Sequence, residues 1–216
     1  MKPPILVSIT YFGPIQYYAK WVSDHPVCLE AHENYLKQTF RNRCIIASAN
    51  GRLNLTVPVV REERSKIPIR EVRIDYSSPW QKNHLRALES AYRKSPFFDF
   101  YIDELLPLFR KRPTFLFDLD LEISHALCSI LKINNELSLT CEYVGSGSNP
   151  LDFRESIAPG EKWSDPDFSP PLYSQNFAEK YGFLENLSIL DLLFQTGPDA
   201  SDILKESWKP EGIEFS

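Results

Sequence analysis

The chain has 216 residues, of which 43% are hydrophobic and 25% are charged. These values are typical of a globular protein that builds its own core, and they exclude a disordered chain. The formal net charge is −5, and no apolar stretch approaches the ~20 residues that a membrane span needs, so we expect no membrane span.

The charge is unevenly distributed along the chain. Residues 37–94 contain thirteen lysines and arginines against five acidic residues, whereas residues 95–216 contain nine against twenty-one. A basic region of this size favours a small anionic partner, such as a phosphate, a nucleotide or a carboxylate-bearing donor. The acidic half would repel a long phosphate backbone, so we do not expect nucleic acid as a partner. The alternative is that the two halves pair with each other inside the protein.

The four cysteines, Cys28, Cys44, Cys128 and Cys141, form no C-x-x-C pair. Their apolar or strand-like surroundings indicate reduced thiols rather than a zinc site or a disulfide framework. We therefore predict a cytoplasmic location and no metal site. The apolar run at residues 5–9 lacks a following cleavage site, which favours a buried strand over a signal peptide.

The first part of the chain is predicted to consist mainly of strands. They cover residues 5–10, 27–31, 43–49, 53–60 and 69–75. A helix begins near Pro14, because proline suits the first helical position. Asn50-Gly51 lies between two apolar runs and is the strongest short signal for a hairpin.

The second part is predicted to be mostly helical, with a further strand at 137–143. The predicted helices cover 78–94, 98–109, 114–132 and 173–181, followed by a pair that begins at Ser188 and restarts after Gly197. In the first of these, apolar and charged side chains occupy opposite faces, and Ser78 can cap its start. Strands followed by helices indicate an α/β or α+β fold, which we expect to be a single domain over 1–216 with a mixed sheet in its N-terminal part.

Residues 145–171 interrupt the helical part with glycine, serine and proline. A stretch of this length without regular structure is typical of a flexible loop or a functional lid. Asp152 and Arg154 within it could close over a ligand, or they could form a local salt bridge.

The densest polar segment lies just before the hairpin. It contains Lys37, Gln38, Arg41, Asn42 and Arg43 within seven residues. A guanidinium group matches two oxygens of a phosphate or carboxylate, and the amides can add hydrogen bonds. If the segment is extended, Arg41 and Arg43 point the same way. We predict that it binds the anionic partner, and the alternatives are a solvated turn or ion pairs with the acidic half.

Glu33 and His84 are the candidate general bases. Glu33 follows Glu30 and His32, which would share one face of a strand, but the sequence provides no third metal ligand at motif spacing. His84 projects from the apolar face of its helix, either as a core residue or as a base held neutral by burial. No motif identifies a nucleophile or a cofactor.

Four blocks of the sequence carry a resemblance to a known family. They are YFGPIQYYAKW at 11–21, LEAHENYLKQTFRNRCII at 29–46, the segment 72–101, and YSQNFAEKYGFLENLSILDLLFQTGPDA at 173–200. Together they resemble the WbqC-like protein family, which is associated with bacterial surface-polysaccharide gene clusters and largely lacks a defined activity. This association, the basic segment and the buried His84 together lead to the hypothesis of a transferase that acts on an activated sugar or acyl donor. The alternative is a non-catalytic protein that binds a small anionic ligand or a partner.

The resemblance also implies roles for individual residues. The residues in the matching blocks that would bind substrate are Gln16, Lys37, Gln38, Arg41, Asn42 and Arg43. Three of these carry the positive charge that would hold the donor's anionic group, and Glu33 or His84 would act as general base. Relatives carry a glycine- and tyrosine-rich segment where this chain reads EYVGSGSNPLDFRES, and only Asp152 and Arg154 match there. This departure implies a different substrate.

Overall fold

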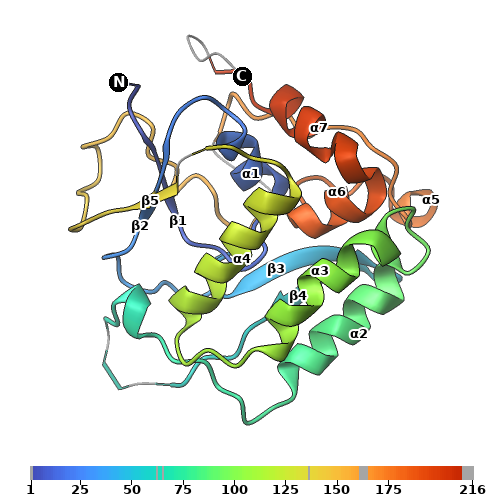
Figure 1. The fold of residues 1–216 in the computed structure, drawn as a ribbon, viewed down its shortest axis with the longest axis horizontal. Helices are drawn as coiled ribbons and strands as arrows, with labels where there is room; N and C mark the ends of the chain where they lie inside the picture. The colour runs from blue at the N-terminus through green and yellow to red at the C-terminus, as the bar shows by residue number, and fades with distance from the viewer. Residues whose placement is uncertain (1, 62, 65, 136, 161–164, 211–216) are drawn as a thin grey trace.

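The computed structural model, shown in Figure 1, describes residues 2–61, 63–64, 66–135, 137–160 and 165–210. Within these residues, strands lie mainly in the N-terminal part and helices in the C-terminal part, as predicted. The fold is therefore a mixed α/β domain. Among the described helices, none is both long enough and apolar enough to cross a membrane.

Three strands form a parallel sheet. In spatial order they are β1 (Ile5–Ser8), which is fully buried, β2 (Val27–Glu30) and β5 (Leu137–Leu139). At the free edge of β1, the Leu6 N–H donates to the Leu151 carbonyl at 2.9 Å, and the Leu6 carbonyl accepts from the Phe153 N–H at 2.9 Å. The segment 151–153 therefore extends the sheet, and all four segments end at the same edge.

The predicted hairpin forms from β3 (Arg43–Ser48) and β4 (Gly51–Thr56). Gly51 has a φ of +90°, a conformation that glycine adopts without steric cost. The hairpin pairs antiparallel and forms a separate two-stranded sheet.

The predicted strand at 69–75 is wrong. Its first residues form the 3-10 turn η1 (Ile69–Glu71), and the rest contributes only isolated bridges from Ile74 to Val59 and from Arg73 to Phe115. Pro68 precedes the turn and has no N–H group to donate to a sheet ladder.

The helices follow the prediction closely except near residue 175. They are α1 (Ile15–Trp21), α2 (Trp80–Tyr92), α3 (Phe98–Arg110), α4 (Leu116–Ile130), α5 (Ala178–Tyr181), α6 (Ile189–Thr196) and α7 (Ala200–Ser207), with the 3-10 turn η2 (Gly197–Asp199) before α7. Ser188 caps α6 as predicted, but Ser78 does not cap α2, because Pro79 occupies that position. Tyr173 and Gln175 are not helical, since their side chains bind Asp191 instead.

The core lies between the parallel sheet and the helices (Figure 1). α6 is central, since it contacts α1, α3, α7 and β3, and seven of its eight residues are buried. α1 contacts both α6 and α7, while α2 and α4 flank α3.

Candidate functional site

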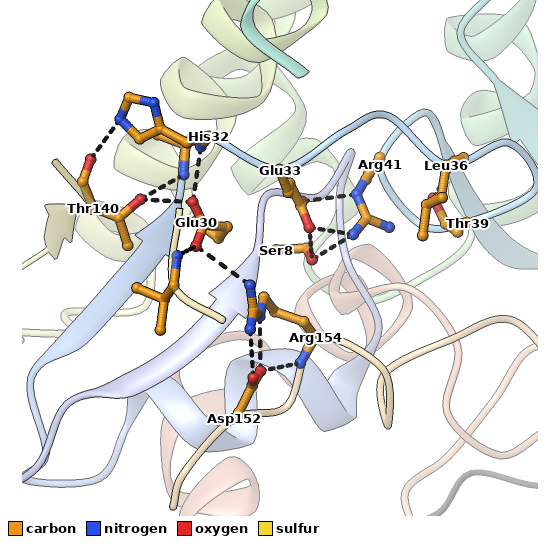
Figure 2. Close-up of polar contacts among 12 residues, drawn as sticks. Ser8, Glu30, His32, Glu33, Leu36, Thr39, Arg41, Thr140, Asp152 and Arg154 are labelled. Carbon is orange, nitrogen blue, oxygen red and sulfur yellow. Dashed lines mark hydrogen bonds and ion pairs between the residues drawn. The ribbon is translucent and has the colours of Figure 1, made fainter. Parts of the chain in front are cut away.

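The carboxyl edge of the parallel sheet gathers polar side chains. Ser8 and Glu30 are the last residues of β1 and β2, Thr140 follows β5, and Arg154 follows the segment beside β1. Parallel strands end at one edge, and ligands of open α/β sheets bind outside that edge. Figure 2 shows these side chains meeting there.

Arg41 and Glu33 form a buried ion pair next to Ser8, at the carboxyl edge of the sheet. Its Nε donates to Glu33 Oε1 at 2.8 Å and its Nη2 donates to Glu33 Oε2 at 2.6 Å (Figure 2). The same Nη2 donates to the Ser8 hydroxyl at 2.7 Å, and this hydroxyl donates to Glu33 Oε2 at 3.0 Å. The side chains of Arg41 and Glu33 are only 5% and 8% exposed. Both Glu33 oxygens thus accept hydrogen bonds from the protein, and the paired Arg41 guanidinium favours the ionised carboxylate over one that has taken up a proton.

The Glu30 carboxylate accepts hydrogen bonds from three other segments at the same edge, namely from Thr140, Val144 and Arg154. Its fully buried Oε1 accepts from the Thr140 hydroxyl and from the His32 N–H, each at 2.8 Å. Its Oε2 accepts from the Val144 N–H at 2.9 Å and from Arg154 Nη1 at 3.3 Å. The Glu30 carboxylate is therefore fully used by the protein itself.

Arg154 forms a two-bond ion pair with Asp152. Its Nε and Nη2 donate to the two Asp152 oxygens at 2.9 and 2.6 Å. These bonds raise the pKa of Arg154 above its ordinary value. The guanidinium also lies 5.4 Å from the centre of the Tyr143 ring. Asp152 and Arg154 are thus held in one arrangement, which is the local salt bridge described by one of the two interpretations of the sequence.

A hollow of about 210 Å³, here called the strand-end cavity, lies beside these two ion pairs. Its wall includes Glu33, Arg41, Asp152 and Arg154, and so brings together four of the predicted site residues. The remaining wall residues are Asn34, Leu36, Tyr143, Ser146 and Glu155. Its charged groups are three carboxylates and two guanidinium groups, of which both guanidinium groups are paired.

A second hollow of about 520 Å³, here called the basic cavity, is lined by four more of the predicted site residues. Lys37, Gln38, Asn42 and Arg43 line it, together with Arg61, Glu63 and Arg64 from the following loop. Its apolar wall consists of Tyr35, Val59, Val60, Ile67 and Val72. Residues of the segment 33–43 are thus divided between the two cavities. Arg41 and Arg43 do not share one, because the chain is extended only from Arg43 onward.

Arg43 is half-buried in the wall of the basic cavity and has no partner among the residues that the structure describes. Its guanidinium makes no hydrogen bond or ion pair within the described residues, and its Nε is shielded from solvent. The neighbouring Asn42 donates from Nδ2 to the Val57 carbonyl at 2.9 Å, but its buried Oδ1 has no partner in the same part of the chain. Buried polar groups are nearly always paired, because an unpaired one costs about 1–3 kcal/mol. Both residues line the basic cavity, and an anion bound there would pair with the guanidinium group of Arg43.

Gln38 adopts a left-handed backbone conformation with a φ of 62°. For a residue with a Cβ atom this conformation costs about 1–2 kcal/mol. Backbone strain of this kind is concentrated at ligand sites, where the surrounding structure maintains it. The turn leaves the side chains of Gln38 and Lys37 exposed at the basic cavity.

His84 lies in the core and in neither cavity wall. It is 5% exposed, its Nδ1 lies 2.9 Å from the Tyr11 hydroxyl, and its ring packs against Trp80. Burial lowers the pKa of His84 to about 4, partly opposed by a hydrogen bond to the Thr56 backbone. The ring is therefore neutral at neutral pH, but it does not face the other candidate residues.

Gln16 belongs to a separate buried cluster. Its Nε2 donates to Asp165 at 3.2 Å, and Asp165 also pairs with the fully buried Lys20. The Lys20 ammonium lies 3.9 Å from the centre of the Trp208 ring. This cluster attaches part of the predicted loop 145–171 to α1, and residues 161–164 of that loop lie outside the described residues.

Reasoning from the sequence missed Ser8 and Asp120. Ser8 closes a buried strand, and its position at the carboxyl edge depends on strand pairing that the sequence does not show. Asp120 lies on the apolar face of α4, between Leu116 and Ile123, and this helical spacing was a usable signal. Neither of its carboxyl oxygens has a partner among the described residues, and burial raises the pKa of Asp120 well above its ordinary value.

The sequence of the chain was compared with protein families and with known proteins. A profile of the WbqC-like protein family matches residues 10–158, a span that includes the walls of both cavities. The chain belongs to the WbqC-like protein family. This WbqC-like protein is similar to the uncharacterised protein Rv1507c of Mycobacterium tuberculosis (strain ATCC 25618 / H37Rv), with 30% identity over 194 residues that cover 79% of the chain and 84% of the relative. No solved structure matches it.

Proposed function

We propose that this WbqC-like protein binds a small anionic molecule in the basic cavity. The observation that supports the proposal most strongly is the guanidinium of Arg43, which has no partner within the described part of the chain and shares its wall with Lys37 and Arg61. Guanidinium groups bind phosphates and carboxylates through two parallel N–H···O bonds. These bonds are stronger in a partly desolvated cavity than on an open surface, because the local dielectric constant is lower.

The neighbouring Arg41 provides the contrast. Its guanidinium is satisfied by Glu33 and Ser8, so it has no need of an external anion. Arg43 lies two residues further along and has no such carboxylate within the described residues. We therefore assign anion binding to Arg43 and not to Arg41.

Exposed apolar side chains around the two cavities also favour a binding role. Seven large hydrophobic residues are classed as exposed among the described residues, and three of them line the cavities. They are Val60 in the basic cavity and Leu36 and Tyr143 in the strand-end cavity. Small-molecule sites combine apolar walls with a few fixed polar groups, as these walls do.

The finer proposal is a transferase that acts on an activated sugar or acyl donor. The basic cavity would hold the donor's anionic group, and the strand-end cavity would receive the acceptor. Glu33 would act as general base after leaving Arg41, and the segment 145–171 would act as a lid that carries Asp152 and Arg154. His84 would act as general base only if the hydrogen bond between its Nδ1 and the Tyr11 hydroxyl broke. Catalysis by Glu33 or by His84 would break a buried contact, so binding remains the function that the geometry supports best.

We also propose that the protein is located in the cytoplasm. All four cysteines are free thiols, and one of them, Cys44, is buried. Free thiols are typical of a reducing compartment.

Calorimetric titration with inorganic phosphate and pyrophosphate tests the binding role. We expect saturable binding that weakens about 10- to 100-fold in Arg43→Gln, since a hydrogen bond to a charged group contributes about 1.5–3 kcal/mol. Arg86→Gln is the matched control, because Arg86 is an exposed arginine on α2 outside this wall. Absence of binding by the unmodified protein, or equal losses in both variants, would overturn the proposal.

A further inference from the structure

The wall of the basic cavity includes uncharged side chains that an inorganic anion would not need. They are Tyr35, Val59, Val60, Ile67 and Val72. The volume of about 520 Å³ falls within the ~300–1,000 Å³ that is usual for small-molecule sites. A phosphate or carboxylate group fills only a small part of it. The natural ligand should therefore join its anion to a larger planar or apolar group.

Tyr35 is suited to contact a planar group. The N–H of Tyr35 donates to the Ile67 carbonyl at 2.8 Å, which fixes the backbone on one side of the cavity. Its ring is half-buried, packs against the core and lines the cavity. An aromatic ring held in this way provides a stacking surface, and stacking of a nucleobase on such a ring contributes about 1–3 kcal/mol.

Asn42 indicates that the planar group carries an N–H donor. The bond from its Nδ2 to Val57 fixes the orientation of the amide and leaves Oδ1 as an acceptor without a partner among the described residues. Because this Oδ1 is covered by the protein, a ligand would reach it only after a local side-chain movement. Gln38 adds a second amide at the same wall. An alkyl chain offers no donor to either residue, whereas all nucleobases carry N–H groups on their edges.

We propose that the basic cavity binds a nucleoside phosphate. Its phosphate contacts Arg43, Lys37 and Arg61, its base lies against Tyr35, and an N–H group of the base donates to Asn42. This assignment rests on the proposed anion site and narrows its ligand class. Free nucleotides and nucleotide-linked donors share this chemistry, and the experiment below distinguishes them.

The test compares ligands that share the phosphate and differ in the rest. Calorimetric titrations use inorganic phosphate, ribose 5-phosphate, the four ribonucleoside 5′-monophosphates, a uridine diphosphate sugar and octanoyl phosphate. We expect at least one nucleotide to bind about 5- to 100-fold more tightly than ribose 5-phosphate, which lacks only the base. A uridine diphosphate sugar that binds more tightly than every free nucleotide assigns the site to a nucleotide-linked donor, and the reverse order assigns it to free nucleotides.

The variant Tyr35→Leu should remove the preference for the base and leave the affinity for ribose 5-phosphate unchanged. Tyr181→Leu is the matched control, because Tyr181 is an exposed tyrosine on α5 that lines neither cavity. If Tyr35→Leu does not fold, the comparison of ligands on the unmodified protein decides alone. Equal affinities for nucleotides and ribose 5-phosphate, or tighter binding of octanoyl phosphate, would overturn the nucleotide assignment and leave the anion site standing. Failure of every phosphate compound to bind would overturn both.

Discussion

The buried ion pair between Arg41 and Glu33 gives the most quantitative prediction. Glu33→Gln keeps the size of the side chain but removes the charge that balances Arg41, whose side chain is 5% exposed. Removing one partner of a buried pair costs about 3–5 kcal/mol, because the other charge stays buried and uncompensated. Domains are usually stable by only about 5–15 kcal/mol, so this loss should be large and easily measured.

The assay is urea unfolding followed by circular dichroism, analysed as a double-mutant cycle. Arg41→Met in the Glu33→Gln background should cost much less than Arg41→Met alone, since no unpaired carboxylate remains. We expect a coupling of about 2 kcal/mol or more, because a buried charge is left unpaired in each single variant.

The exposed pair between Lys111 and Glu122 is the internal control. Its atoms are 2.8 Å apart, but the side chains are 56% and 41% exposed. The same cycle there should give a coupling below about 1 kcal/mol. Equal couplings at the two sites, or a loss under about 1 kcal/mol for Glu33→Gln, would refute the assignment of Arg41 to an internal structural role.

Three further predictions concern buried titratable groups. His84, with its pKa lowered to about 4, should stay neutral when the pH falls to about 5, so its imidazole NMR signals should not move over that range. Burial raises the pKa of Asp191 to about 6, so between about pH 4 and pH 6 the native state holds a proton that the unfolded chain has lost. The free energy of unfolding should therefore fall as the pH rises from about 4 to about 6, and this slope should be absent in Asp191→Asn. Asp165→Asn leaves the buried Lys20 cation unpaired and should lower the free energy of unfolding by about 3–5 kcal/mol. Hydrogen exchange of the backbone amides should also accelerate in residues 151–160. Unchanged exchange there would show that the pair between Lys20 and Asp165 does not hold this segment in place.

Local signals explain which elements the sequence predicts. The hairpin depends on Asn50-Gly51, and α2 depends on a 3.6-residue periodicity, so both can be read from neighbouring residues. The order of the parallel sheet cannot be read in this way, because β2 pairs with β5 far along the chain. The carboxyl edge, and with it the position of Ser8, follows only from that pairing.

The candidate site was predictable as a segment but not as an arrangement. The dense polar segment between Lys37 and Arg43 lines two cavities in the structure. Which of its residues lies in which cavity depends on the ion pair between Arg41 and Glu33 and on the left-handed turn at Gln38. Pairing partners and turn conformations of this kind depend on tertiary contacts that a local pattern does not contain.

The central claim is that Arg43, unlike Arg41, is available to an external anion. The most direct measurement records the NMR signals of the arginine Nε–H groups while inorganic phosphate is added. The Arg43 signal should shift and saturate with phosphate concentration, and the Arg41 signal in the same spectrum should stay in place. An Arg43 signal that does not respond, or an Arg41 signal that responds in its stead, would contradict the account.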